Sequence, residues 1–242
     1  MHIKYVVLVM AAMAVAVPAL HADEPALRTT LSERSPMLKI EAVHATPIPG
    51  VFEVVSQDKQ VFYTDANGDY VLTGNLIETA TRNNLTRERI EGLNVVDFAS
   101  LPFNKAIPVV RGNGSRRLAV FSDPDCPYCK QLEKELALLN DVTIHVFLYP
   151  IASLHPEATK HAKAIWCAPD RAKSWTAHML EDKQPTGDGK CDNPVDEIVA
   201  LGNSLGINAT PTMIFANGKR VSGSQSAGQI EALLKTNVVA TK

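Results

Sequence analysis

The chain has 242 residues and a formal net charge of −2, with 45% hydrophobic and 21% charged residues. This composition is typical of a globular protein, and the length suits one large domain or two small ones. The nearly neutral charge argues against nucleic acid or an anionic membrane surface as the main partner.

Residues 1–22 have the pattern of a cleavable secretory signal peptide. Lys4 gives a positive start, Tyr5 to Leu20 is almost wholly apolar, and Ala22 is a small residue at the expected cleavage point. A membrane anchor is the alternative, but the apolar run is too short to span a bilayer and Pro18 interrupts it. We therefore expect an exported, soluble mature protein.

Residues 23–84 are predicted to form a small β-rich domain. Leucines at roughly helical spacing in residues 24–38 predict a short amphipathic helix. The turn residues Asp65–Gly68 predict a hairpin between two β-favouring segments. The predicted strands are 40–45, 51–55, 61–64 and 70–72, with 75–78 as a possible edge strand.

This first domain is predicted to pair with a second copy of itself. A domain of this size without cysteines has a weak hydrophobic core. Tyr70–Glu78 is a plausible exposed edge, and such an edge gains hydrogen bonds by pairing with an identical strand. A two-fold pairing closes at two copies, so we expect a homodimer.

A charged linker helix is predicted over residues 85–104, with Asn84 or Thr86 as its N-cap. Opposite charges three and four residues apart favour this helix, whereas Gly92 disfavours it. Residues 111–115 predict a turn before the next strand.

A Cys-Pro-Tyr-Cys motif joins a predicted buried strand, Leu118–Phe121, to a predicted helix over residues 129–139. Cys126 would meet the unpaired N–H groups and the positive dipole end of that helix, which stabilise a thiolate. Pro127 suits the first helical turn because its missing N–H would have no partner there. Cys129 lies close enough to release a mixed disulfide.

The segments that follow predict one catalytic domain over residues 105–242. Strand 142–149 completes a strand-helix-strand unit, which implies parallel pairing. Asn217-Gly218 predicts a hairpin turn near the end. Helices are predicted at 156–167, 173–180, 195–205 and 225–234, and strands at 213–215 and 219–221. The fold class is therefore α+β.

These features together resemble the DsbC/DsbG family of periplasmic thiol:disulfide interchange proteins. The resemblance covers nearly the whole mature chain and is stronger in the C-terminal half. The second cysteine pair is similar to DsbC, whereas Pro127 departs from the Cys-Gly-Tyr-Cys of the best-known DsbC. The matching stretches are Phe121–Asp123 before the motif, Ala164–Ala168, Cys191-Asp192, and Leu205–Ile207 leading to Thr210-Pro211.

The resemblance implies a thioredoxin-like catalytic domain in which residues 156–205 form a helical insertion. It implies a periplasmic location and an inner-membrane reductase of the DsbD type as electron donor. It places Gly74 in the dimer contact, where the missing Cβ lets backbones approach closely. It also implies a cis Thr210–Pro211 bond beside the cysteines, which would leave backbone groups for a substrate peptide; a trans bond is the common alternative.

The four cysteines allow several pairings. A structural disulfide or half of a zinc site is the alternative for Cys126 and Cys129, but a zinc site needs a second ligand pair at short spacing. We expect a redox pair in which Cys126 attacks and Cys129 resolves, with no metal or cofactor. Cys167 and Cys191 lie outside any Cys-x-x-Cys, so a structural bridge is favoured over a second redox pair.

The other polar residues near the motif are interpreted as structural. Asp123 and Asp125 are read as solvated turn acids. Tyr128 is expected to contact a bound peptide or to cover the helix end. Three histidines have no cysteine or acid at a telling distance in the sequence: His145, His155 and His161.

We therefore expect a thiol:disulfide isomerase and reductase that acts on misfolded or mis-oxidised exported proteins, with some chaperone activity. Isomerisation needs a reduced dithiol in an oxidising compartment. Three alternatives remain: a dithiol oxidase, a DsbG-like reductase of sulfenic acids on single cysteines, and a protein that acts mainly as a holdase chaperone.

Overall fold

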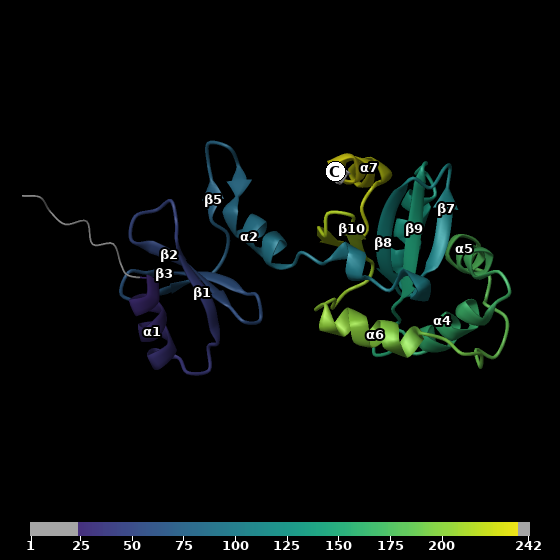
Figure 1. Ribbon diagram of the computed structural model, residues 1–242, viewed down its shortest axis with the longest axis horizontal. Coiled ribbons are helices and arrows are strands. Elements are labelled where there is room, and N and C mark those ends of the chain that lie inside the picture. Colours follow the sequence, from purple (N-terminus) through teal and green to yellow (C-terminus); the bar gives the residue numbers. More distant parts are fainter. Residues whose placement is uncertain (1–23, 237–242) are drawn as a thin grey trace, which may run out of the picture. The chain divides into compact units, whose positions relative to one another are not determined.

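The computed structural model describes residues 24–236, so the predicted signal peptide lies outside the described part. The chain divides into two compact units between Thr86 and Arg87. Figure 1 shows the elements of each unit coloured along the chain. Among the described residues, no helix has both the length and the apolar character needed to cross a membrane.

The first unit is one helix packed against a four-stranded antiparallel sheet with strand order β1-β2-β3-β4. Leu27 and Leu31 lie one helical turn apart and are buried with Phe52, Val54 and Phe62 of the sheet. The helix ends earlier than the predicted residue 38. The elements are α1 (Glu24–Arg34), β1 (Ile40–Ala45), β2 (Val51–Ser56), β3 (Val61–Asp65) and β4 (Val71–Leu72).

The predicted hairpin between β3 and β4 is confirmed. The Asp65 carboxylate accepts hydrogen bonds from the backbone N–H groups of Asn67 at 3.3 Å, Asp69 at 2.8 Å and Tyr70 at 2.9 Å. Gly68 has a φ of +69°, a conformation that glycine adopts without a steric cost. The turn is thus stabilised by the hydrogen bonds of the Asp65 side chain and by the positive φ that Gly68 can adopt.

The last strand of this sheet is a free edge within the unit. β4 pairs on one side with β3, and among residues 24–236 it has no partner strand on the other side. Tyr70, Val71 and Leu72 are each more than half exposed. A short two-stranded ladder follows, made of β5 (Ile77–Glu78) and β6 (Asn83–Asn84). The edge of the sheet therefore presents apolar side chains to solvent.

The predicted linker helix forms over part of its expected length. α2 covers Leu85–Leu93, and two short 3-10 turns follow at Phe98–Ser100 and Phe103–Lys105. The first 3-10 turn begins at Asp97, whose carboxylate accepts a hydrogen bond from the Ala99 N–H at 3.0 Å. Residues 98–100 therefore form a separate turn with its own cap instead of a continuation of α2.

The second unit is built on a five-stranded mixed sheet with order β11-β10-β8-β9-β7. β8 and β9 pair in parallel, and α3 lies between them in the chain, so the predicted strand-helix-strand unit is confirmed. The other pairs are antiparallel. The strands are β7 (Ile107–Arg111), β8 (Arg116–Ser122), β9 (Val142–Leu148), β10 (Thr212–Phe215) and β11 (Arg220–Ser222).

The edge strand β7 is not among the elements predicted from the sequence. In the sequence, Pro108 favours the end of a segment at this place, because proline cannot donate a hydrogen bond to a sheet. Within the described part of the chain β7 pairs with β9 alone, so the N–H groups on its other side need no partner strand. Ile107 and Val109 are buried while Pro108 and Val110 are exposed, which is the alternation of a half-buried strand.

The sheet is covered on both faces. Leu118 and Val120 of β8 belong to one buried cluster, and Ala119 and Phe121 belong to another. Successive residues of a strand point to opposite faces, so β8 is a central strand with no solvent-facing side. The helices are α3 (Pro127–Leu136), α4 (Ala158–Cys167), α5 (Arg171–Glu181), α6 (Val195–Ser204) and α7 (Ala227–Thr236).

Candidate active site

The two motif cysteines lie where β8 passes into α3. Cys126 is the N-cap of α3 with an extended backbone, φ −76° and ψ 123°, and Pro127 occupies the first helical turn. The Cys126 carbonyl accepts hydrogen bonds from the N–H groups of Cys129 and Lys130, both at 3.1 Å. The Cys126 thiol is thus placed at the positive end of the helix dipole.

The environment of Cys126 favours its thiolate. A hydrogen bond from the Cys129 thiol and hydrogen bonds from the backbone N–H groups of Cys129 and Tyr128 lower the pKa of Cys126 to about 5. The residue is only 5% exposed, and its Sγ lies 3.6 Å from the Thr210 carbonyl oxygen. Only a small part of this residue is therefore open to a substrate disulfide.

Cys129 has the opposite character. It is 1% exposed, and burial raises the pKa of its thiol above the ordinary value. The Asp123 backbone N–H donates a hydrogen bond to its Sγ at 3.4 Å. The pKa of Cys126 is thus lowered and that of Cys129 is raised, so Cys126 forms a thiolate more readily than Cys129.

Two further predicted site residues face Cys126 from another strand. The Thr210–Pro211 peptide bond is cis and immediately precedes β10, which pairs with β8. This places the Thr210 carbonyl beside the Cys126 sulfur. Tyr128 is 66% exposed on the first turn of α3, so its ring is available to another molecule.

The other cysteines form a disulfide between Cys167 and Cys191. Cys167 is the last residue of α4, and Cys191 lies in the exposed loop before α6. The bridge therefore ties the end of one helix of the insertion to the loop that leads to the next helix.

Gly74 lies in the exposed segment between β4 and β5 of the first unit. Its φ is +128°, which glycine adopts readily and other residues rarely do. A Cβ at this position would meet no atom of the chain within 4 Å. The backbone conformation thus favours glycine at this position. A larger side chain would be strained by this φ but would not clash with other atoms of the same chain.

The interpretation of Asp123 as a solvated turn acid is wrong, because the residue is fully buried. Its Oδ1 accepts a hydrogen bond from the Asp125 N–H at 2.8 Å, and its Oδ2 accepts one from the Ile151 N–H at 2.7 Å. Oδ2 also lies 3.0 Å from Nδ1 of His155, and this hydrogen bond raises the pKa of His155. Asp123 therefore ties the loop after β9 to the loop that carries Cys126.

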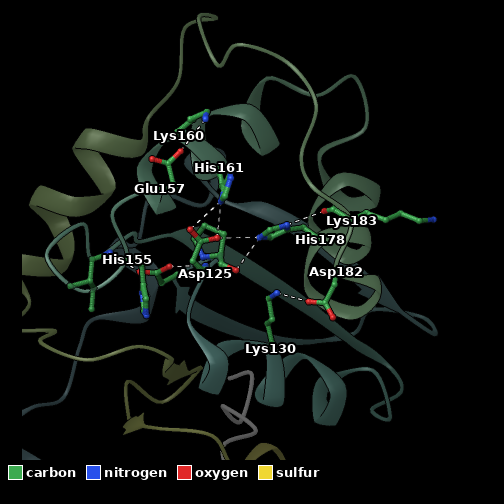
Figure 2. Close-up of polar contacts among 12 residues, drawn as sticks. Asp125, Lys130, His155, Glu157, Lys160, His161, His178, Asp182 and Lys183 are labelled. Carbon is green, nitrogen blue, oxygen red and sulfur yellow. Dashed lines mark hydrogen bonds and ion pairs between the residues drawn. The ribbon is translucent and has the colours of Figure 1, made fainter.

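The interpretation of His155 and His161 as histidines without an acid partner is also wrong. His161 Nδ1 lies 2.8 Å from Asp125 Oδ1, and His178, which the sequence did not single out, approaches the same carboxylate oxygen at 3.4 Å. Figure 2 shows both rings directed at Asp125. His161 on α4 and His178 on α5 meet Asp125 through the packing of these helices on the active-site loop, and His155 meets Asp123 from the loop after β9. The partners are far apart in sequence, so spacing alone could not reveal these pairs. Burial lowers the pKa of His145 to about 4, and no described residue forms a hydrogen bond with its buried Nδ1.

Both units match known protein families. Residues 103–237 match the thioredoxin-like domain, and residues 18–87 match the N-terminal domain of disulfide bond isomerase proteins. A probable thiol:disulfide interchange protein DsbC from Bordetella avium is 43% identical over 88% of this chain and 75% of its own length. DsbC from Escherichia coli is 26% identical over 88% of both chains. A crystal structure of a disulfide interchange protein from Neisseria gonorrhoeae is 50% identical, with a TM-score of 0.55 over 57% of this chain and 98% of that one. The chain therefore belongs to the DsbC family of thiol:disulfide interchange proteins, which are enzymes of the disulfide isomerase type.

Proposed function

We propose that this chain is a periplasmic isomerase that rearranges wrong disulfides in exported proteins through Cys126 and Cys129. The observation that carries the proposal is the placement of Cys126 at the N-terminus of α3, beside the buried Cys129 thiol. A thiolate at that position is the nucleophile of disulfide exchange.

Isomerisation leaves the number of disulfides unchanged. The Cys126 thiolate attacks one sulfur of a substrate disulfide, forms a mixed disulfide and releases the other substrate sulfur as a thiolate. A different substrate thiolate then attacks the substrate sulfur of the mixed disulfide. A new substrate disulfide forms and Cys126 leaves as a thiolate, so no net electrons are transferred.

Reduction is the second outcome of the same intermediate. Cys129 loses its proton and attacks the Cys126 sulfur, so the Cys126–Cys129 disulfide forms and the substrate leaves as a dithiol. Burial raises the pKa of Cys129, which lowers its thiolate fraction and slows this escape. A substrate thiol thus has time to complete the rearrangement first. We assign Thr210, Pro211 and Tyr128 to contact with the substrate chain.

The in-cell redox state of Cys126–Cys129 tests this function, because an isomerase must be kept reduced and a dithiol oxidase must be kept oxidised. Cells are quenched with acid, free thiols are alkylated, and the protein is analysed by mass spectrometry. We expect a reduced pair that becomes oxidised when the inner-membrane reductase of the DsbD type is deleted. A pair that is oxidised in wild-type cells would contradict the proposal and support the oxidase.

We divide the mature chain into a dimerisation domain (23–84), a linker (85–104) and a catalytic domain (105–242). A homodimer formed by the first domain would give substrates a cleft between two catalytic domains. Support comes from the free edge at β4 and from the exposed Tyr70, Val71 and Leu72 beside it. An unpaired edge with apolar side chains favours pairing with an identical copy.

Substitution of Gly74 tests the dimer. Gly74→Arg should give mostly monomer, keep dithiol chemistry and lose isomerase activity on scrambled proteins. Gly74→Ala is the matched control, because it imposes the same backbone strain at a φ of +128° without a bulky, charged side chain. Light scattering and refolding assays provide the readouts. A wild-type monomer at micromolar concentration, or full isomerase activity in monomeric Gly74→Arg, would contradict the proposal.

A further inference from the structure

Three side chains outside the dithiol converge directly beside the active-site motif. Asp125 lies on the loop before α3, His161 on α4 and His178 on α5. Each offers one potential ligand atom, and these atoms all lie within 4.8 Å of one another. Figure 2 shows the carboxylate of Asp125 between the two imidazole rings.

His178 has a backbone carbonyl oxygen beside each of its two ring nitrogens. Its Nδ1 lies 3.0 Å from the Lys183 carbonyl oxygen, and its Nε2 lies 3.0 Å from the Pro124 carbonyl oxygen. A neutral imidazole carries one N–H, so it can donate to only one of these oxygens. If Nδ1 donates to Lys183, the lone pair of Nε2 faces the oxygens of Pro124 and Asp125. The lone pairs of these three atoms then converge, and a bound cation would stabilise that arrangement.

We propose that Asp125, His161 and His178 form a binding site for a divalent transition-metal ion, best matched by Zn²⁺. Two imidazole nitrogens and one carboxylate oxygen suit zinc or its neighbours and do not suit Mg²⁺ or Ca²⁺, which prefer oxygen ligands. Three protein ligands leave one position open. The proposal goes beyond the isomerase function and does not depend on it.

The distances agree with a zinc site after small side-chain movements. Zinc bonds of about 2.0–2.2 Å in a tetrahedron place neighbouring ligand atoms about 3.4 Å apart. Asp125 Oδ1 and His178 Nε2 are 3.4 Å apart, and Asp125 Oδ1 and His161 Nδ1 are 2.8 Å apart. Of these two pairs, the second must separate, and both of its side chains are partly exposed, at 20% for Asp125 and 17% for His161. The two histidine nitrogens lie within 4.8 Å of each other.

The surroundings also resemble those of a metal ligand. A metal-bound histidine commonly donates its other N–H to a backbone carbonyl, as Nδ1 of His178 can do to Lys183. The neighbouring cation Lys130 is held in an ion pair with Asp182, at 2.5 Å, instead of with Asp125. A metal here would connect the active-site loop to α4 and α5, so binding should stabilise the second unit.

Cobalt and zinc titrations of the full mature chain test the proposal. The parent protein carries Cys126→Ser and Cys129→Ser, so that thiolates cannot bind metal, and it carries no affinity tag. We expect one Co²⁺ per chain with a visible absorption spectrum free of thiolate charge transfer, displacement by Zn²⁺, and a rise in the melting temperature with either metal.

Variants of two proposed ligand residues test whether the metal binds at this cluster. Asp125→Asn and His161→Gln keep the side-chain size and should each weaken Co²⁺ binding by on the order of 100-fold or more, given that even supporting contacts cost 10- to 100-fold. His155→Asn is the control, because His155 pairs with Asp123 outside the cluster. It should bind Co²⁺ as the parent does.

Three results would overturn the proposal. The first is the absence of saturable Co²⁺ or Zn²⁺ binding at micromolar concentrations in the folded parent. The second is equal binding in the parent and both ligand variants. The third is an NMR spectrum in which His178 stays an imidazolium with saturating Zn²⁺ present, which would mean that the cluster holds a proton instead of a metal.

Discussion

The two cysteine pairs of the second unit differ in which end of a helix they occupy. Cys126 is the N-cap of α3, where the dipole is positive, whereas Cys167 is the last residue of α4, where it is negative. The first position stabilises a thiolate and the second does not. Cys191 is exposed while Cys126 and Cys129 are buried, so we expect reactivity to follow the local electrostatic field and not exposure.

Graded reduction gives the largest expected difference between the pairs. The Cys126–Cys129 disulfide should open at a mild dithiol concentration that leaves Cys167–Cys191 closed, because reduction of the first pair releases a stabilised thiolate. Closing a loop of this length also stabilises the fold by about 3.5 kcal/mol in the chain-entropy model. Mass spectrometry after alkylation measures both pairs. Opening of the exposed bridge first would mean that accessibility controls reduction.

The pH dependence of alkylation tests the lowered pKa of Cys126 separately from the other cysteines. With a pKa of about 5, the rate in the reduced protein should reach half of its maximum near pH 5. An ordinary thiol with a pKa of about 8.5 would be only a few per cent thiolate at pH 7, so the thiolate fraction should be at least 10-fold higher here. Iodoacetamide labelling in the presence of a chelator measures this. A midpoint above pH 8 would contradict the assigned role of the helix terminus.

A smaller effect, on the pH dependence of stability, is expected from Glu133, which is buried on α3. Burial raises the pKa of this carboxyl to about 7, so between pH 4.5 and pH 7 the folded protein binds more protons than the unfolded chain. The unfolding free energy contributed by this group therefore falls as the pH rises, by up to about 3 kcal/mol. Glu133→Gln should remove that loss and be the more stable protein at pH 8.

Urea unfolding of the oxidised protein, in which Cys126 does not titrate, provides the measurement for Glu133. The exposed Glu157→Gln controls for the change in net charge. A difference between wild type and Glu133→Gln that does not vary from pH 4.5 to pH 8 would show that the carboxyl does not titrate in this range.

The dithiol site and the α+β fold were predictable because their signals are local. The Cys-x-x-Cys motif, the buried strand before it and the hairpin turn at Asp65–Gly68 each depend on neighbouring residues. The polar network around the motif was not predictable. Asp123 is buried and bonded to Ile151 and His155 in the loop after β9, and no local pattern distinguishes a buried turn acid from a solvated one.

β7 illustrates a different limit. A proline normally argues against a strand, and only the position of β7 at the sheet edge makes Pro108 acceptable. That position depends on the order of strands distant in sequence. Local propensity therefore predicted a break where tertiary pairing forms a strand.

The assignment of Cys126 as the attacking thiol is tested most directly by trapping mixed disulfides in two matched variants. Cys129→Ser removes the resolving thiol, and Cys126→Ser removes the attacking one. Each reduced variant is incubated with a scrambled disulfide protein, and the linked peptides are identified by mass spectrometry. We predict that mixed disulfides accumulate on Cys126 in Cys129→Ser and are absent from Cys126→Ser. Accumulation on Cys129 in the Cys126→Ser variant would contradict the account.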